Sequence, residues 1–172
     1  MQNLLAYCMA SRIQVLVPIT IAAIIVGIAG IISLPSDVKL ESVEFPRGTV
    51  KLDSIVLEVQ IADTDPRRVR GLMFQEQLPF DQGMLFVFDN ANKQSIWMLN
   101  MQFPLDIVWI DGNGKVVFIE KNVPPCKTAL ETVACPSYKG GNKDAKYVLE
   151  VTAGFAEKFN ITTESTLEII SI

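Results

Sequence analysis

The sequence predicts a mainly β domain, a compact sandwich or barrel with one or two short helices, preceded by one transmembrane helix. Beyond residue 48, apolar and polar side chains alternate with a period of two in one short segment after another. Glycine, proline and asparagine separate these segments at the close spacing that is typical of sandwiches and barrels. Before them, residues 13–34 contain no charged side chain.

The uncharged segment has the length of a membrane span. At about 1.5 Å per helical residue, its 22 residues would reach roughly 33 Å, enough for a hydrocarbon core of about 30 Å. The lipid bilayer is therefore an expected partner of residues 13–34. We expect a short cytoplasmic N-terminus over residues 1–12, a linker over 35–47 and one domain over 48–172.

The flanking charge predicts on which side of the membrane the domain lies. Arg12 is the only cation that precedes the segment, and cations favour the cytoplasmic side. The prediction is a single-pass protein of the cytoplasmic membrane with its domain on the extracytoplasmic side. A cleaved signal peptide is the alternative, because small residues such as Ala29 and Ser33 occur near the end of the segment.

The alternation in the domain indicates its strands. Ile55, Leu57, Val59 and Ile61 point one way, with polar residues between them, which is typical of a half-buried strand. The same pattern predicts strands at residues 83–88, 95–99, 106–110, 115–120, 145–151 and 166–170. The run 111–114 (DGNG) predicts a tight hairpin turn, because glycine and asparagine accept positive φ.

Two short helices complete the expected elements. In the first, Asp63 or Thr64 caps a turn that has Pro66 near its start and ends at Gly71. The second is expected over residues 153–159, with Thr152 as its cap. Asn160 would end this second helix.

The cysteines divide between the two sides of the membrane. Cys8 precedes the apolar segment, whereas Cys126 and Cys135 would share the oxidising side, where we expect them to form a structural disulfide. Metal binding or redox work by this pair is the alternative. Zinc sites usually combine cysteine with histidine or further cysteines, and redox pairs are usually spaced Cys-x-x-Cys. The chain has no histidine and no Cys-x-x-Cys pair.

Composition excludes several classes of function. The chain carries 15 basic and 19 acidic residues, a net charge of −4, with no basic stripe of the kind that nucleic acid requires. It contains no Gly-x-Ser-x-Gly elbow and no phosphate-binding glycine loop. We therefore expect no nucleic-acid partner, no cofactor and no metal site.

A family resemblance runs through most of the domain, from about residue 56 to residue 170. In order, it rests on Arg70-Gly71-Leu72-Met73, Gly83-Met84-Leu85-Phe86, Trp97-Met98-Leu99-Asn100, Pro104-Leu105-Asp106, Cys135-Pro136-Ser137-Tyr138 and Ala145-Lys146-Tyr147-Val148-Leu149-Glu150. These motifs resemble domain-of-unknown-function family 192 (DUF192). The resemblance implies a compact, mainly β fold behind a signal peptide or anchor, and no established activity.

The chain departs from the family pattern in one motif. Relatives often carry Trp-Met-Lys-Asn-Thr where this chain has Leu99 and Met101 in place of the lysine and threonine. If these groups contact a ligand in relatives, this protein would bind that ligand differently or not at all.

Our leading hypothesis is a non-enzymatic ligand- or partner-binding module, with an unknown small molecule or protein as partner. The candidate surface lies between residues 70 and 111, with Arg70, Trp97, Asn100 and Asp106 as its candidate binding residues. Asp106 has a structural alternative, in which Arg70 or Asn100 pairs with a buried carboxylate. The methionines and tryptophans in this stretch either line an apolar groove or belong to the core.

Two other functions remain open. One is a carboxylate-dependent hydrolase acting on envelope glycans, with Asp106 paired to Glu120 or Glu150. The other is the redox or metal chemistry of Cys126 and Cys135.

Overall fold

The structure is a computed structural model that describes residues 43–128, 131 and 133–172. These belong to one compact unit, Val43–Ile172. The predicted anchor at 13–34, the N-terminus at 1–12 and residues 35–42 of the linker lie outside the described residues. Within the described part, no helix is long and apolar enough to cross a membrane.

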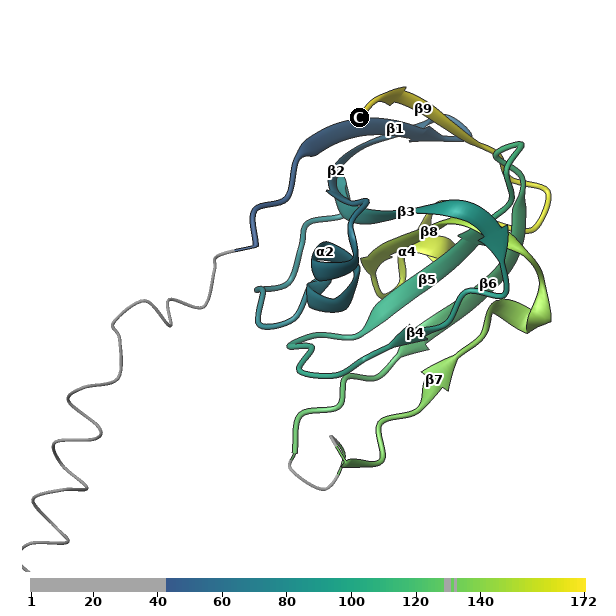
Figure 1. Ribbon diagram of the computed structural model, residues 1–172. Coiled ribbons are helices and arrows are strands. Elements are labelled where there is room, and N and C mark those ends of the chain that lie inside the picture. Colours follow the sequence, from purple (N-terminus) through teal and green to yellow (C-terminus); the bar gives the residue numbers. More distant parts are fainter. Residues whose placement is uncertain (1–42, 129–130, 132) are drawn as a thin grey trace, which may run out of the picture. The chain divides into compact units, whose positions relative to one another are not determined.

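The described residues are mainly β with two short α-helices, as the sequence predicts (Figure 1). In chain order the elements are β1 (Arg47–Leu52), β2 (Ile55–Ala62), α2 (Asp65–Arg70), β3 (Gln82–Asn92), β4 (Ile96–Trp97), β5 (Leu105–Ile110), β6 (Val116–Val123), β7 (Ser137–Tyr138), the 3-10 turn η1 (Gly140–Asn142), β8 (Ala145–Thr152), α4 (Phe155–Lys158) and β9 (Leu167–Ser171).

Seven strands form one sheet in the order β6-β5-β8-β3-β2-β1-β9. Neighbouring strands are antiparallel except β2 and β3, which are parallel and are connected through α2. Strands β4 and β7 form a separate antiparallel pair. This arrangement places β8 and β3, which are distant in sequence, side by side at the centre of the sheet.

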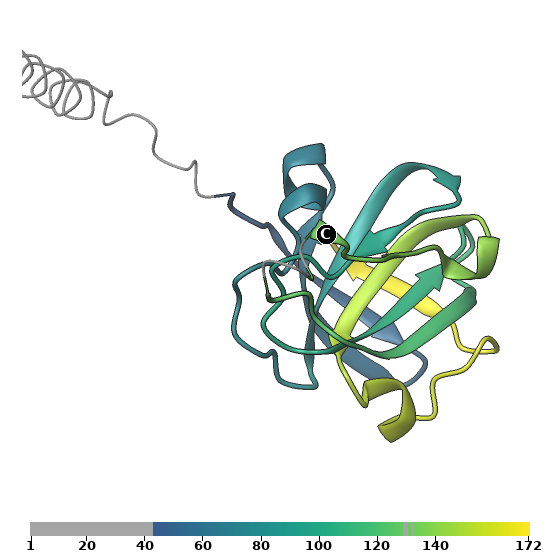
Figure 2. The same ribbon diagram turned by 90° about the horizontal axis from the view of Figure 1, so that it is seen from below.

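The sheet does not close into a barrel, which was one of the two forms expected from the sequence, because the two edge strands β6 and β9 do not pair along their length. They meet at one end, where Lys115 and Thr166 form an isolated antiparallel bridge. At the same place the N–H of Leu167 donates to the carbonyl of Gly114 at 2.7 Å. The sheet therefore curls until its edges touch at one end without closing (Figure 2).

The sheet is covered on both faces. Alternate residues of the central strands point to opposite faces, and all six residues of β5 are buried. One face packs with α4 around Val108, Leu149 and Phe155. The other face packs around Ile107, Val148 and Met84, beneath β4 and the segments beside it.

A disulfide stabilises the segment that covers the second face of the sheet together with β4. Cys126 and Cys135 are bonded, with their Cα atoms 5.9 Å apart, as the sequence predicts. The N–H of Cys126 donates to the carbonyl of Met98 at 2.9 Å, which ties the bonded segment to the residues after β4. Strand β7 then pairs with β4 through Ile96–Tyr138 and Trp97–Ser137.

Most predicted elements agree with the structure, and the second helix needs correction. Helix α4 is shorter than predicted, and Gly154, at φ 88°, is its N-cap. Thr152 is the last residue of β8, and its hydroxyl donates to the carbonyl of Leu78. The carboxylate that reaches the first turn of α4 comes instead from Asp106.

Candidate functional site

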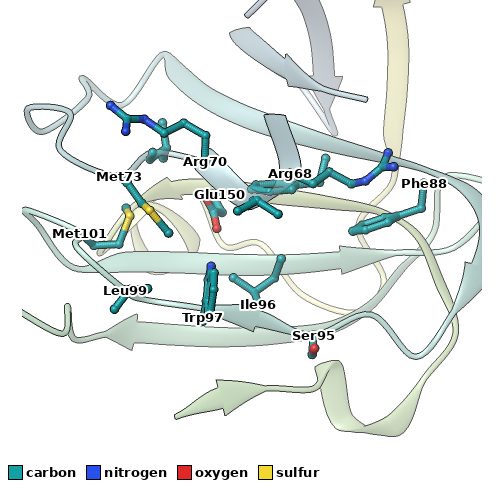
Figure 3. A pocket seen from close by; sticks show the side chains of 14 residues that line it. Arg68, Arg70, Met73, Phe88, Ser95, Ile96, Trp97, Leu99, Met101 and Glu150 are labelled. Atoms are coloured by element: carbon teal, nitrogen blue, oxygen red, sulfur yellow. The ribbon is translucent and has the colours of Figure 1, made fainter. Parts of the chain in front are cut away.

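The candidate site is a small cavity between α2 and the segment that contains β4, which we call the α2–β4 cavity (Figure 3). Its volume is about 80 Å³. Most lining side chains are apolar, aromatic or sulfur-containing; with the polar ones they are Arg68, Val69, Arg70, Gly71, Leu72, Met73, Phe86, Phe88, Ser95, Ile96, Trp97, Leu99, Met101 and Glu150.

Glu150 is the exceptional group in this lining. Only 3% of the residue is exposed, and its Oε2 atom has no hydrogen-bond partner among the described residues. Burial raises the pKa of the Glu150 carboxyl to about 8, because the surrounding apolar groups disfavour the charged form. The cavity therefore contains a carboxyl group that is mostly protonated at pH 7.

The register of β8 directs Glu150 into the cavity. Glu150 lies opposite Met84 of β3 and Ile107 of β5, whose side chains belong to the apolar layer on that face. A position in this register normally carries an apolar side chain. The sequence signal is a lone acid two positions after Val148, at an apolar position of the alternation, where Glu150 is otherwise a candidate only for a carboxylate pair.

Two of the three arginines of α2, Arg68 and Arg70, line the cavity, and neither forms an ion pair with Glu150. Arg68 donates to the carbonyls of Asp63 and Val87 at 2.7 and 2.8 Å and to the Asp65 carboxylate at 2.6 Å. The guanidinium carbon of Arg70 lies 5.0 Å from the centre of the Phe74 ring. Figure 3 shows both guanidinium groups directed away from Glu150.

Trp97 lies at the mouth of the cavity, as expected of a binding residue. It is 45% exposed, an unusual value for a tryptophan in a compact domain. The other tryptophan, Trp109, is fully buried, and its indole N–H donates to the carbonyl of Gln94 at 3.1 Å. The structure therefore assigns one tryptophan to the cavity and the other to the core.

Asn100 shapes the wall of the cavity through its backbone. Its φ of 56° is in the left-handed region, which asparagine tolerates better than most residues. Its N–H donates to the carbonyl of Cys126 at 3.1 Å, and its carbonyl accepts from the N–H of Phe74 at 3.1 Å. Asn100 thus connects the residues after α2 to the disulfide segment, and its side chain does not line the cavity.

Asp106 lies on the opposite face of the sheet from Glu150. Its neighbour Ile107 is the residue paired with Glu150, and adjacent strand residues point to opposite faces. The Asp106 carboxylate is fully buried and accepts from the backbone N–H groups of Asn122 and Ala156, both at 2.8 Å. The expected partners Arg70 and Asn100 are therefore replaced by two backbone donors.

This geometry also separates the residues of the proposed carboxylate pair. Asp106 lies on a different face from both proposed partners, because Glu120 and Glu150 are each paired with its neighbour Ile107. Cys126 and Cys135 are joined to each other, and no cluster of three or more potential metal ligands occurs in the described part of the chain. Of the candidate binding residues, the structure brings Arg70 and Trp97 together at the cavity.

The positions that depart from the family pattern both line the same cavity. Leu99 and Met101 contribute to its wall, together with Met73. Met84 and Met98 are fully buried in the core. Met101 belongs to the core cluster as well, so its side chain lies in the core and at the cavity wall.

An open groove of about 300 Å³ continues the cavity toward solvent. It shares Arg68, Val69, Phe88, Ser95 and Trp97 with the cavity. The groove adds Asp65 and Ser137, which are polar. A ligand could therefore place a small group in the cavity and the rest of its structure in the groove.

Fold and site together define a mainly β domain with a small apolar cavity that contains one buried carboxyl group. The sequence profile of the DUF192 family, described as uncharacterized ACR, matches residues 48–169. The chain belongs to this family. No curated protein matches it.

Two solved structures share the fold. One is a candidate transcription regulator from Sinorhizobium meliloti 1021, 28% identical, with a TM-score of 0.64 over 74% of this chain and 96% of that one. The other is a protein of unknown function from Novosphingobium aromaticivorans DSM 12444, 25% identical, with a TM-score of 0.60 over 76% of this chain and 89% of that one. Sequence family and fold thus agree.

Proposed function

We propose that this protein is a binding module whose ligand enters the α2–β4 cavity. The observation that carries the proposal is Glu150, a buried carboxyl with an unpartnered oxygen in an apolar cavity. Buried polar groups are almost always hydrogen-bonded, and an exception in a cavity marks a candidate binding site. Trp97 and Arg70 line the cavity, and Asn100 connects the segments beside it, whereas Asp106 lies on the opposite face of the sheet.

Native mass spectrometry of the full-length protein, purified from its host, tests this function. We expect a small molecule or partner to co-purify with the wild-type chain and to be lost in Trp97→Ala. Tyr138→Ala is the matched control, because Tyr138 is an aromatic residue of the paired strand β7 that does not line the cavity. A ligand that is retained by a folded Trp97→Ala variant would place the binding site elsewhere.

We further propose that residues 13–34 anchor the domain on the extracytoplasmic side of the cytoplasmic membrane. The uncharged length of that segment and the disulfide between Cys126 and Cys135 support this location. The intact chain should sediment with the membrane fraction. Protease added to intact spheroplasts should digest the domain. A domain that is protected until the cells are lysed would contradict the proposed topology.

A further inference from the structure

We infer that the α2–β4 cavity binds a small organic cation, an alkylammonium group, through Glu150. This inference rests on the proposed binding function and specifies the chemical class of the ligand. Its basis is the lining of the cavity: a carboxyl oxygen that has no partner among the described residues shares this lining with the rings of Phe86 and Trp97 and the methionines Met73 and Met101. Such surroundings attract cations, because aromatic faces carry negative charge density.

Arg68 and Arg70 are the cationic residues of the cavity lining, and neither forms an ion pair with Glu150; the Arg68 guanidinium carbon lies 5.5 Å from the centre of the Phe88 ring. Arg68 is held by two carbonyls and the Asp65 carboxylate. Arg70 lies over the ring of Phe74, and Figure 3 shows it pointing away from Glu150. Strands β3 and β4 and the residues after β4 contribute only uncharged side chains to the cavity. Asp106 of β5 faces the opposite side of the sheet.

The size of the cavity limits the ligand. With a volume of about 80 Å³, the cavity accommodates a small group, such as the ammonium end of a ligand with its nearest carbon atoms. Leu99 and Met101 provide apolar contacts for the carbons. The open groove at Trp97 receives the remainder of the chain, whether it belongs to a free amine or to a lysine side chain.

Binding of a cation would be linked to the loss of a proton from Glu150. The ionised carboxylate pairs with the cation, whereas the protonated form does not. With the Glu150 pKa at about 8, affinity should rise roughly tenfold per pH unit between pH 6 and pH 8 and then level off. An anionic ligand would show the opposite dependence, because the ionised carboxylate repels it.

Fluorescence titrations of the full-length protein with butylammonium, butanol and butyrate test the inference. Trp97 serves as the reporter at the cavity mouth, because Trp109 is buried in the core. We expect butylammonium to bind with the stated pH dependence and at least tenfold more tightly than butanol or butyrate at pH 8. A blocked lysine amide titrated in parallel distinguishes a polypeptide from a free amine as the source of the ammonium group.

Two variants examine the role of the carboxylate. Glu150→Gln should lose the butylammonium response at every pH. Leu99→Lys should also lose it, because an internal ammonium would occupy the cavity. Gln102→Lys, which adds the same charge at an exposed position of the same segment, is the matched control and should bind like the wild type.

The outcomes separate this inference from the proposed function. Tighter binding of butyrate or butanol would overturn the cationic class and leave the cavity as a binding site. A butylammonium response that persists in Glu150→Gln or does not change with pH would also overturn it. If none of the three compounds binds, the cationic class is wrong, and the co-purification experiment decides the binding function separately.

Discussion

Glu150 and Asp106 are both buried carboxyl groups, and their different surroundings give them different roles. Asp106 accepts two backbone hydrogen bonds, which compensate the cost of its burial. Glu150 has an oxygen without any partner in the described part of the chain, and burial raises its pKa to about 8. We therefore assign Asp106 to the framework and Glu150 to the cavity.

The stability of the protein should depend on pH through Glu150. Its folded-state pKa of about 8 lies above the ordinary value of 4.5, so the folded state binds more protons between these values. The stabilising contribution is complete below pH 4.5 and is lost as the pH rises through about 8. At its steepest, the free energy of unfolding falls by about 1.4 kcal/mol per pH unit.

Glu150→Gln should remove this dependence, because glutamine does not titrate. In urea denaturation, the variant should resemble the wild type near pH 5 and become progressively more stable than the wild type toward pH 8. A constant difference between the two proteins over this range would show that the Glu150 carboxyl does not titrate within it.

Asp106→Ala should lower the free energy of unfolding by about 2 to 5 kcal/mol, because two backbone N–H groups lose their acceptor. Asp106→Asn should cost less, since its single amide oxygen still accepts. Urea denaturation measures both effects, with the exposed Asp144→Ala as control. A loss in Asp106→Ala as small as that in the control would contradict the framework role.

At the scale of elements, local pattern predicted strands well and their pairing poorly. Alternation at Leu57, Val59 and Ile61 located β2, because one face of that strand is buried and the other is not. The same pattern located β5, although all six residues of that strand are buried because both of its faces are covered. Strand β7 has only two residues, so its pairing with β4 could not be predicted from periodicity.

The lining of the cavity could be predicted only in part, because it combines residues that are distant in sequence. The motifs placed Arg70 and Trp97 in one candidate region, and both line the cavity. Glu150 joins them from β8, since the sheet order brings β8 next to β3 and β5. Nothing local to residues 70–111 indicates that long-range pairing.

The contact between the sheet edges predicts that the two glycines of the DGNG hairpin differ in their importance for stability. Gly114 has φ 84°, and a Cβ added there would collide with the carbonyl oxygen of Leu167. Gly114→Ala should therefore lower the free energy of unfolding by more than about 2 kcal/mol. Gly112→Ala, in the same turn, meets open space and should change it by less than about 0.5 kcal/mol. Equal effects in thermal denaturation would show that the edges do not meet at Gly114.

The disulfide should stabilise the segment that supports β4. On the chain-entropy model, a loop with this sequence separation of 9 contributes about 2 to 3 kcal/mol. The double variant Cys126→Ser/Cys135→Ser should be less stable than the wild type by that amount in urea denaturation. Reductant should lower the free energy of unfolding of the wild type to that of the variant and leave the free energy of unfolding of the variant unchanged. A wild type insensitive to full reduction would contradict this role.

The domain as a whole is a curled sheet that is covered on both faces and has a small cavity beside it. The sheet and its apolar layers explain why the domain folds, and within the described residues the Oε2 atom of Glu150 is buried without a hydrogen-bond partner. The DUF192 profile covers this whole arrangement, from β1 to β9. The central claim is that a ligand supplies the missing partner.

A crystal structure of the protein grown with butylammonium at pH 8.5 tests this claim most directly. The account predicts the ammonium nitrogen inside the α2–β4 cavity, about 3 Å from a Glu150 carboxylate oxygen, with the alkyl chain between Leu99 and Trp97. A cavity that contains only water while the cation is absent or bound elsewhere would contradict the account.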